Sequence, residues 1–166
     1  MFDFRKLTAF FVRKPTAYEQ AVRDIALGRY DRAITALDGL MGGAATPAER
    51  AMIWNKRGVA LVKAGRRDDA RASFASALAA MPQFAPALVN EGNLAFEEGD
   101  ISRAVALYES AVRCDDSYSV AHLNLGVAYK RLGRRGDAVR EFRRANRLEG
   151  VGFFPTGRRK GNPRAD

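Results

Sequence analysis

Cysteine and histidine are almost absent from this chain. Its 166 residues contain one cysteine, Cys114, and one histidine, His122. One cysteine excludes an intramolecular disulfide, and one residue of each kind argues against a Cys/His zinc site or a histidine-based triad. The chain also lacks a phosphate-binding glycine loop and a nucleophile with an adjacent base. We therefore predict no enzyme activity, no metal and no cofactor.

Long apolar runs are also missing. No segment approaches the roughly 20 apolar residues that a membrane-spanning helix needs. The apolar stretch from Leu7 to Val12 is short, precedes Arg13, Lys14 and Pro15, and is followed by no small-residue cleavage site. The sequence therefore predicts neither a spanning helix nor a secretory signal, and we expect a cytoplasmic protein. Hydrophobic residues make up 47% and charged residues 28%, which is typical of a globular chain.

The net charge of +9 is unevenly distributed. Residues 119–166 hold 12 Lys/Arg and 4 Asp/Glu, and residues 1–15 hold 4 Lys/Arg and 1 Asp, whereas residues 16–118 hold 12 Lys/Arg and 14 Asp/Glu. Basic ends can meet nucleic acid, acidic lipid or an acidic protein, and the sign of the charge does not choose among them. Arg outnumbers Lys by 22 to 6, which favours a GC-rich bacterial source.

A 34-residue period runs through the chain. Five columns of residues recur at intervals of 34: Gly58, Gly92 and Gly126; Gly65, Gly99 and Gly133; Ala70, Ala104 and Ala138; Phe74, Tyr108 and Phe142; and Ala77, Ala111 and Ala145. Five columns in one register indicate structural repeats, each a supersecondary unit that stacks on its neighbours.

Each repeat has the pattern of two helices. Small and apolar residues recur at helical spacing in 119–132 and again in 136–148. Gly133 lies between them and can adopt the left-handed conformation that ends a helix. An earlier, weaker unit has Ala21, Gly28, Ala33 and Leu37 at the corresponding positions. The pattern predicts an all-α protein.

The repeat resembles the tetratricopeptide repeat, a helix-turn-helix of 34 residues. The matching residues of the first clear unit are Trp54, Gly58, Leu61, Ala70, Phe74 and Pro82. This resemblance implies a right-handed α-solenoid of about four repeats. We predict an amphipathic segment at 1–14, a repeat domain at 15–150 (a degenerate unit at 15–45, then 51–84, 85–118 and 119–150) and a basic tail at 151–166.

The small residues of the columns predict how the helices pack. We expect the two helices of a unit to approach until their backbones nearly touch, with the aromatic residue filling a wider gap two turns away. The last unit has Arg135, Glu141 and Asn146 where the preceding unit has Ile101, Leu107 and Val112. We expect this exchange to expose the outer face of the last unit and to end the stack.

The resemblance also implies a concave groove lined by the first helix of each unit. The groove positions correspond to Tyr18, Val22, Asn55, Val59, Lys63, Val89, Asn90, Asn93, Phe96, Leu123, Asn124, Val127, Lys130 and Arg131. Asparagine can bond both groups of a peptide backbone while apolar pockets select side chains. We therefore predict a non-catalytic scaffold that binds a segment of a partner protein. The alternative is that some of these residues pack in the core and have no binding role.

One subclass of the family grips the terminal carboxylate of heat-shock chaperones with a fixed Lys/Asn/Arg pattern. This chain has the central Asn90, but it has Asn55 and Val59 where Lys and Asn belong. It has Val120 and Asn124 where Lys and Arg belong. The pattern is therefore absent, and we do not expect that activity.

Both ends combine aromatic and basic residues. The residues that form this second candidate site are Phe4, Leu7, Phe11, Phe153, Phe154, Arg158, Arg159 and Lys160. Such ends suit an anionic membrane surface or a membrane-associated complex, so peripheral membrane attachment is the alternative function. Alternatively, the three N-terminal apolar residues cap the first repeat, and an uncapped first repeat leaves self-association open.

Nucleic-acid binding is a third reading, based on the arginines of the last unit. A charge run on a final helix is usually a solvated face, and no nucleic-acid motif or stacking aromatic accompanies it. We therefore rank nucleic acid below a protein partner.

Overall fold

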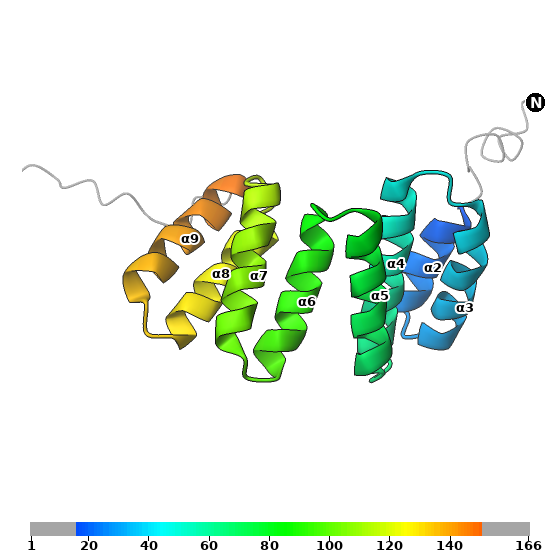
Figure 1. Cartoon of the computed structure of the whole chain (residues 1–166), viewed down its shortest axis with the longest axis horizontal. Coiled ribbons are helices and arrows are strands. Elements are labelled where there is room, and N and C mark those ends of the chain that lie inside the picture. Colours follow the sequence, from blue (N-terminus) through cyan, green and yellow to red (C-terminus); the bar gives the residue numbers. More distant parts are fainter. Residues whose placement is uncertain (1–15, 151–166) are drawn as a thin grey trace, which may run out of the picture.

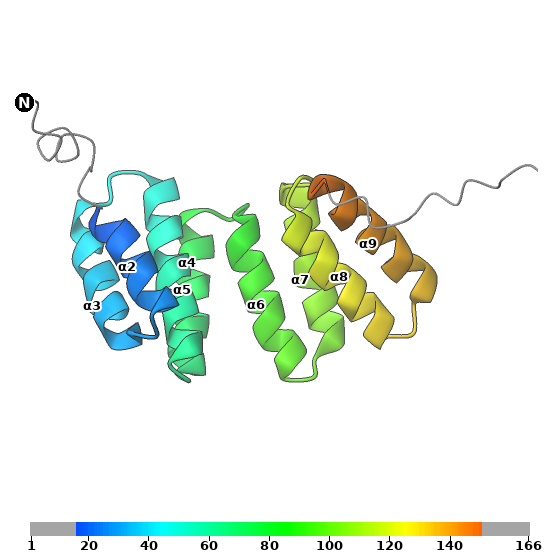
Figure 2. The same ribbon diagram turned by 180° about the vertical axis from the view of Figure 1, so that it is seen from behind.

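A computed structural model of the chain describes residues 16–150, which form an all-α solenoid without strands in that range (Figure 1). The elements are α2 (Ala17–Ala26), α3 (Tyr30–Leu40), the 3-10 turn η1 (Met41–Gly43), α4 (Pro47–Lys63), α5 (Arg67–Ala80), α6 (Ala85–Glu97), α7 (Ile101–Cys114), α8 (Ser119–Arg131) and α9 (Arg135–Leu148). Consecutive helices form four antiparallel pairs that follow one another along the long axis, as the reverse view also shows (Figure 2). The helices predicted at 119–132 and 136–148 agree with α8 and α9 to within one residue.

Local sequence signals explain where the helices begin and end. The turns within the four pairs each contain a glycine with positive φ, between 74° at Gly28 and 87° at Gly99, where L side chains are strained. Thr46 and Glu49 form a reciprocal capping box at the start of α4. Thr16 and Glu19 form a second one at the start of α2, which has the same T-x-x-E pattern and which our sequence analysis missed.

An aromatic ring lies directly on a helix glycine in three of the pairs. A Cβ added at Gly92 would lie 2.5 Å from Cε1 of Tyr108, and one at Gly58 would lie 2.4 Å from Cε1 of Phe74. The same arrangement joins Gly126 and Phe142. The expected near-contact of backbones beside a separate aromatic gap is therefore wrong. The missing side chain of the glycine makes room for the ring of the partner helix.

The core is continuous between the first and second halves of the stack. Leu94 of α6 is buried in the cluster that is otherwise built from α2 to α5. In the other direction, Leu78 of α5 packs against the cluster built mainly from α6 to α9. Each half thus contributes an apolar residue to the core of the other, so adjacent pairs hold each other in register.

The last pair has a polar contact in its interior. The ring of His122 is buried, with Nδ1 2.7 Å from Oε2 of Glu141 and Nε2 3.1 Å from the backbone oxygen of Asp116. Leu88 and Leu107 occupy the same two repeat positions one unit earlier; Leu88 belongs to the apolar cluster and Leu107 packs against it. The expectation that Glu141 faces solvent at the end of the stack is therefore wrong, because it faces a buried histidine within its own pair.

Replacing Gly92 by alanine should destabilise the fold by about 1–3 kcal/mol, because its Cβ would overlap the buried ring of Tyr108. Gly39 is a matched control, since it also lies in a helix but has no atom within 4 Å of an added Cβ. Gly39→Ala should stabilise the protein by about 0.5–1 kcal/mol through reduced backbone entropy of the unfolded chain. Denaturant unfolding of both variants tests this, and equal effects would contradict the packing role.

Exchanging the polar pair for the apolar pair of the preceding repeat should separate desolvation from packing. His122→Leu alone should cost about 1–3 kcal/mol, because it leaves the Glu141 carboxylate without its partner. His122→Leu combined with Glu141→Leu should recover most of that loss, as the two positions are apolar in the preceding pair. A double-mutant cycle measured by urea unfolding tests this coupling. Additive losses in the free energy of unfolding would refute it.

Candidate functional site: the groove of the first helices

The first helices of successive pairs share a hollowed face, which we call the groove. One hollow of this face, the central hollow, has a volume of about 450 Å³. It is lined by α2, α4 and α6 and by the residues that precede α6 and α8, namely Tyr18, Met52, Asn55, Lys56, Val59, Phe84, Pro86, Asn90 and Tyr118. Because three consecutive first helices contribute to one hollow, its shape depends on the stacking and not on a single repeat.

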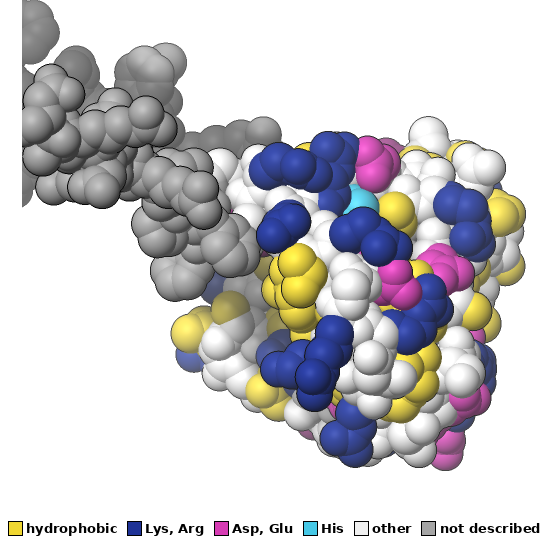
Figure 3. Space-filling model, turned by 90° about the vertical axis from the view of Figure 1, so that its left-hand side faces the viewer, with side chains coloured by type: hydrophobic (Ala, Val, Ile, Leu, Met, Phe, Trp, Pro, Cys, Tyr) yellow, Lys and Arg dark blue, Asp and Glu magenta, His cyan; other side chains and the backbone are white. Residues whose placement is uncertain are grey.

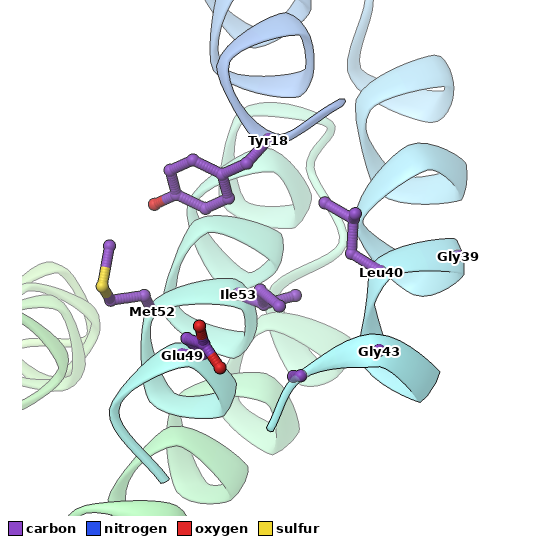
Figure 4. Close-up of a pocket in the computed structure, with 8 residues that line it drawn as sticks. Tyr18, Gly39, Leu40, Gly43, Glu49, Met52 and Ile53 are labelled. Atoms are coloured by element: carbon purple, nitrogen blue, oxygen red, sulfur yellow. The ribbon is translucent and has the colours of Figure 1, made fainter. Parts of the chain in front are cut away.

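A second, more apolar hollow adjoins the groove at its N-terminal end. It has a volume of about 330 Å³ and lies between α2, the end of α3 with η1, and α4. Figure 4 shows Tyr18, Leu40, Met52 and Ile53 around this opening, with the carboxylate of Glu49 beside it. Tyr18 and Met52 line both hollows. A ligand with one side chain in the apolar hollow could therefore extend directly into the groove.

Asparagine side chains link the first helices along the groove. Nδ2 of Asn90 donates to Oδ1 of Asn55, and Nδ2 of Asn124 donates to Oδ1 of Asn93, both at 2.8 Å. The hydroxyl of Tyr108 also donates to Oδ1 of Asn93 at 2.8 Å. Each donating asparagine keeps its Oδ1 and one N–H for other partners. These amides therefore have a structural role in addition to the binding role that we predict for Asn90 and Asn124.

The first helix of the last pair, α8, carries an exposed apolar strip that contains two of the residues predicted for the groove. Leu123 is 43% exposed and Val127 is 41% exposed, and Val120 is similarly accessible one turn earlier. Lys130 and Arg131 are exposed at the end of the same helix. The side chain of Lys63 is exposed in the smaller hollow between α4 and α6, which Val59, Asn90 and Asn93 also line.

Three of the residues assigned to the groove are placed differently. Val89 is only 2% exposed and belongs to the core, so its side chain is not available to a ligand. Phe96 packs against the same core cluster. Val22 is half-buried on α2 and lines none of the three hollows described above. For Val89 the physical reason is helix rotation, which turns this position toward the packed interior.

Two aromatic residues of the groove were missed by our sequence analysis. Phe84 and Tyr118 are the N-cap residues of α6 and α8, and both line the hollow of about 450 Å³. They are themselves 34 residues apart, so the repeat spacing contained the signal. Burial raises the pKa of the Tyr118 phenol, and the charge of Asp115 adds to this shift. Burial also raises the pKa of Tyr18, so both phenols are neutral hydrogen-bonding groups at neutral pH.

The second candidate site lies outside the described residues. Phe4, Leu7 and Phe11 precede residue 16, and Phe153, Phe154, Arg158, Arg159 and Lys160 follow residue 150. Within 16–150, no helix combines the length and the apolar character needed to cross a membrane. In the same range, no group of three His, Cys, Asp or Glu side chains is arranged to hold a metal ion.

Family models identify the class of protein. One model, described as tetratricopeptide repeat, matches residues 18–83 and 55–119, and a second with the same description matches residues 119–144. The chain therefore belongs to the tetratricopeptide repeat family. The match of residues 18–83 includes the degenerate first unit.

Solved structures with the same fold include MamA and domains of RPAP3. A crystal structure of MamA is 21% identical with a TM-score of 0.65, covering 81% of this chain and 77% of that chain. MamA from Desulfovibrio magneticus RS-1 is 22% identical with a TM-score of 0.63, covering 83% and 76%. The second TPR domain of Spaghetti (RPAP3), bound to the HSP90 peptide SRMEEVD, is 24% identical with a TM-score of 0.56, covering 60% and 92%. At these identities the similarity establishes the fold.

Stability should fall as the pH rises from about 10 to about 12, because Tyr108 must stay protonated in the fold. Burial, followed by the charge of Glu97, raises the pKa of this phenol from 10.0 to about 12. In that window the unfolded chain loses the Tyr108 proton and the folded chain keeps it, so deprotonation favours unfolding. Chemical denaturation across pH 9–12 should show a smaller decline for Tyr108→Phe than for the parent. Parallel pH profiles would refute this.

Proposed function

We propose that this protein is a non-catalytic interaction module that binds a segment of a partner protein in the groove. The observation that carries the proposal is the continuity of the groove with the apolar hollow, through the shared residues Tyr18 and Met52. An apolar or aromatic side chain of the partner fits the hollow between Leu40, Met52 and Ile53. The following partner residues then lie along the asparagines.

The asparagines suit an extended or helical segment because they are already positioned. Their bonds to one another limit the side-chain motion that binding would have to restrict. The free acceptor capacity of Asn90 and Asn124 can bind N–H groups of the partner. Exposed Leu123 and Val127 then supply an apolar surface for the far end of the segment.

The RPAP3 domain shows that a protein with this fold can hold a peptide, in that case one from HSP90. Our chain has Asn55 and Val59, and Val120 and Asn124, where the carboxylate-gripping subclass has its charged and amide residues. We therefore propose recognition by apolar contacts and amides, without a clamp for a terminal carboxylate. The partner segment is expected to be internal as readily as C-terminal.

Charged substitutions in the groove should weaken this binding. Met52→Glu and Leu123→Glu each place a carboxylate on an apolar, exposed position of the groove, which leaves the fold intact. A peptide selected from a display library on the intact protein should lose at least tenfold in affinity for each variant, which is about 1.4 kcal/mol or more. Fluorescence anisotropy with the labelled peptide measures the change.

Val139→Glu is the matched control for these variants. Val139 is as exposed as Leu123 but lies on α9, outside the groove. It should leave the affinity unchanged. If Val139→Glu weakens binding while the groove variants do not, or if all three leave it unchanged in folded protein, the groove is not the site.

A further inference from the structure

The last helix presents a repeat-packing face that no described helix covers. In the preceding pair, α7 buries Val105 in the core and directs Glu109 toward α8. Val105 is 7% exposed, and Glu109 accepts a hydrogen bond of 2.6 Å from the hydroxyl of Tyr129 on α8. Ile101 of the same helix packs against the cluster that contains α8 residues. These three residues define the face of a second helix on which the next repeat sits.

The same three positions on α9, one repeat later, are Arg135, Val139 and Arg143. Val139 is 43% exposed, whereas its counterpart Val105 is almost fully buried. Arg135 and Arg143 are exposed and stand where α7 has an isoleucine and a glutamate. The face thus keeps its apolar centre and its helical register, but its flanks have become cationic.

A further cation borders this face from α8. Lys130 stands one repeat after Phe96, which packs against the core cluster. We call Lys130, Arg135, Val139 and Arg143 the end face. Figure 3 views this end of the molecule and shows many Lys and Arg side chains among apolar ones, with few acidic side chains.

The neighbouring carboxylates are engaged elsewhere. Asp137 pairs with Arg134 and Arg140, Asp116 pairs with Arg144, and Glu141 contacts His122. Within residues 16–150, no carboxylate forms an ion pair with Lys130 or Arg135. Lys130 and Arg135 therefore give the end face positive charge beside its apolar centre.

We propose that the end face binds an acidic amphipathic helix of a partner protein, which packs on α9 as α8 packs on α7. Val139 occupies the position of the buried Val105, so a helix with an apolar stripe can pack on it. The cations around Val139 favour carboxylates beside that stripe. Residues 151–166 carry 4 Lys/Arg and 1 Asp, the same sign of charge as the end face. Charge complementarity therefore favours a separate partner over the tail of this chain. Lys130 is shared with the predicted groove, but this proposal does not depend on binding in the groove.

The probe for this proposal is a labelled peptide with the sequence of residues 117–134, the region that contains α8. In α8, the Tyr129 hydroxyl contacts Glu109 of α7, and Arg143 is the residue of α9 at the position of Glu109. The acidic version of the peptide therefore has Tyr129→Glu, which places a carboxylate opposite Arg143. It also has Lys130→Glu, which adds a second carboxylate. The basic counterpart has Tyr129→Lys and keeps Lys130. Fluorescence anisotropy with the intact chain should show at least tenfold tighter binding of the acidic peptide.

Variants of the intact chain locate the site. Arg135→Glu combined with Arg143→Glu should reverse the preference to the basic peptide, and Val139→Asp should weaken the acidic peptide at least tenfold. Met52→Glu, on α4 in the groove, should change nothing, so a failure of the groove proposal would not affect this result. Circular dichroism confirms that each variant remains folded.

The proposal is overturned if the two peptides bind equally, if the charge reversal has no effect, or if only Met52→Glu weakens binding. It is also overturned if the end face serves another occupant. Phosphatidylglycerol vesicles or a single-stranded oligonucleotide that bind through Arg135 and Arg143, without competition from the acidic peptide, would assign the face to a polyanion. Self-association in sedimentation that Val139→Asp abolishes would assign it to a second copy.

Discussion

The contact between an aromatic ring and a glycine sets the geometry of each clear helix pair. Phe74, Tyr108 and Phe142 each lie on a glycine of the partner helix, at a distance that no Cβ would tolerate. Because close packing leaves no room for adjustment, this contact fixes how near the two helices lie and how they are rotated. The same contact recurs every 34 residues, so successive pairs have similar shapes and can stack.

The polar contacts do not recur in every repeat as the ring-on-glycine contact does; each links two specific helices. Asn55 with Asn90, and Asn93 with Asn124, join first helices of successive pairs through hydrogen bonds at the edge of the groove. His122 with Glu141 joins the helices of the last pair. Buried polar groups must be paired, so these positions tolerate only matched partners. Ion pairs such as that of Arg71 with Glu98 lie on the surface and contribute less.

Much of the fold could be predicted from spacing, and much less of the site. The turn glycines, the helix positions and the capping box at Thr46 are local features, which depend on residues close in the sequence. Val89 was misassigned because helical periodicity places it beside Asn90, and a rotation of one residue separates core from groove. Phe84 was overlooked because it precedes its helix and acts on a hollow formed by residues from three helix pairs.

The amino-acid sequence by itself determined the number of repeats, the helices within them and the family. These features depend on the spacing of small and aromatic residues along the chain, which is visible without the tertiary structure. Only the tertiary structure decided that Tyr18 and Met52 are shared by two hollows. It also decided that Glu141 faces a buried histidine, and that Val139 is exposed where Val105 is covered. These properties depend on which side chains from distant segments of the chain come into contact. The stacking of the helix pairs decides those contacts.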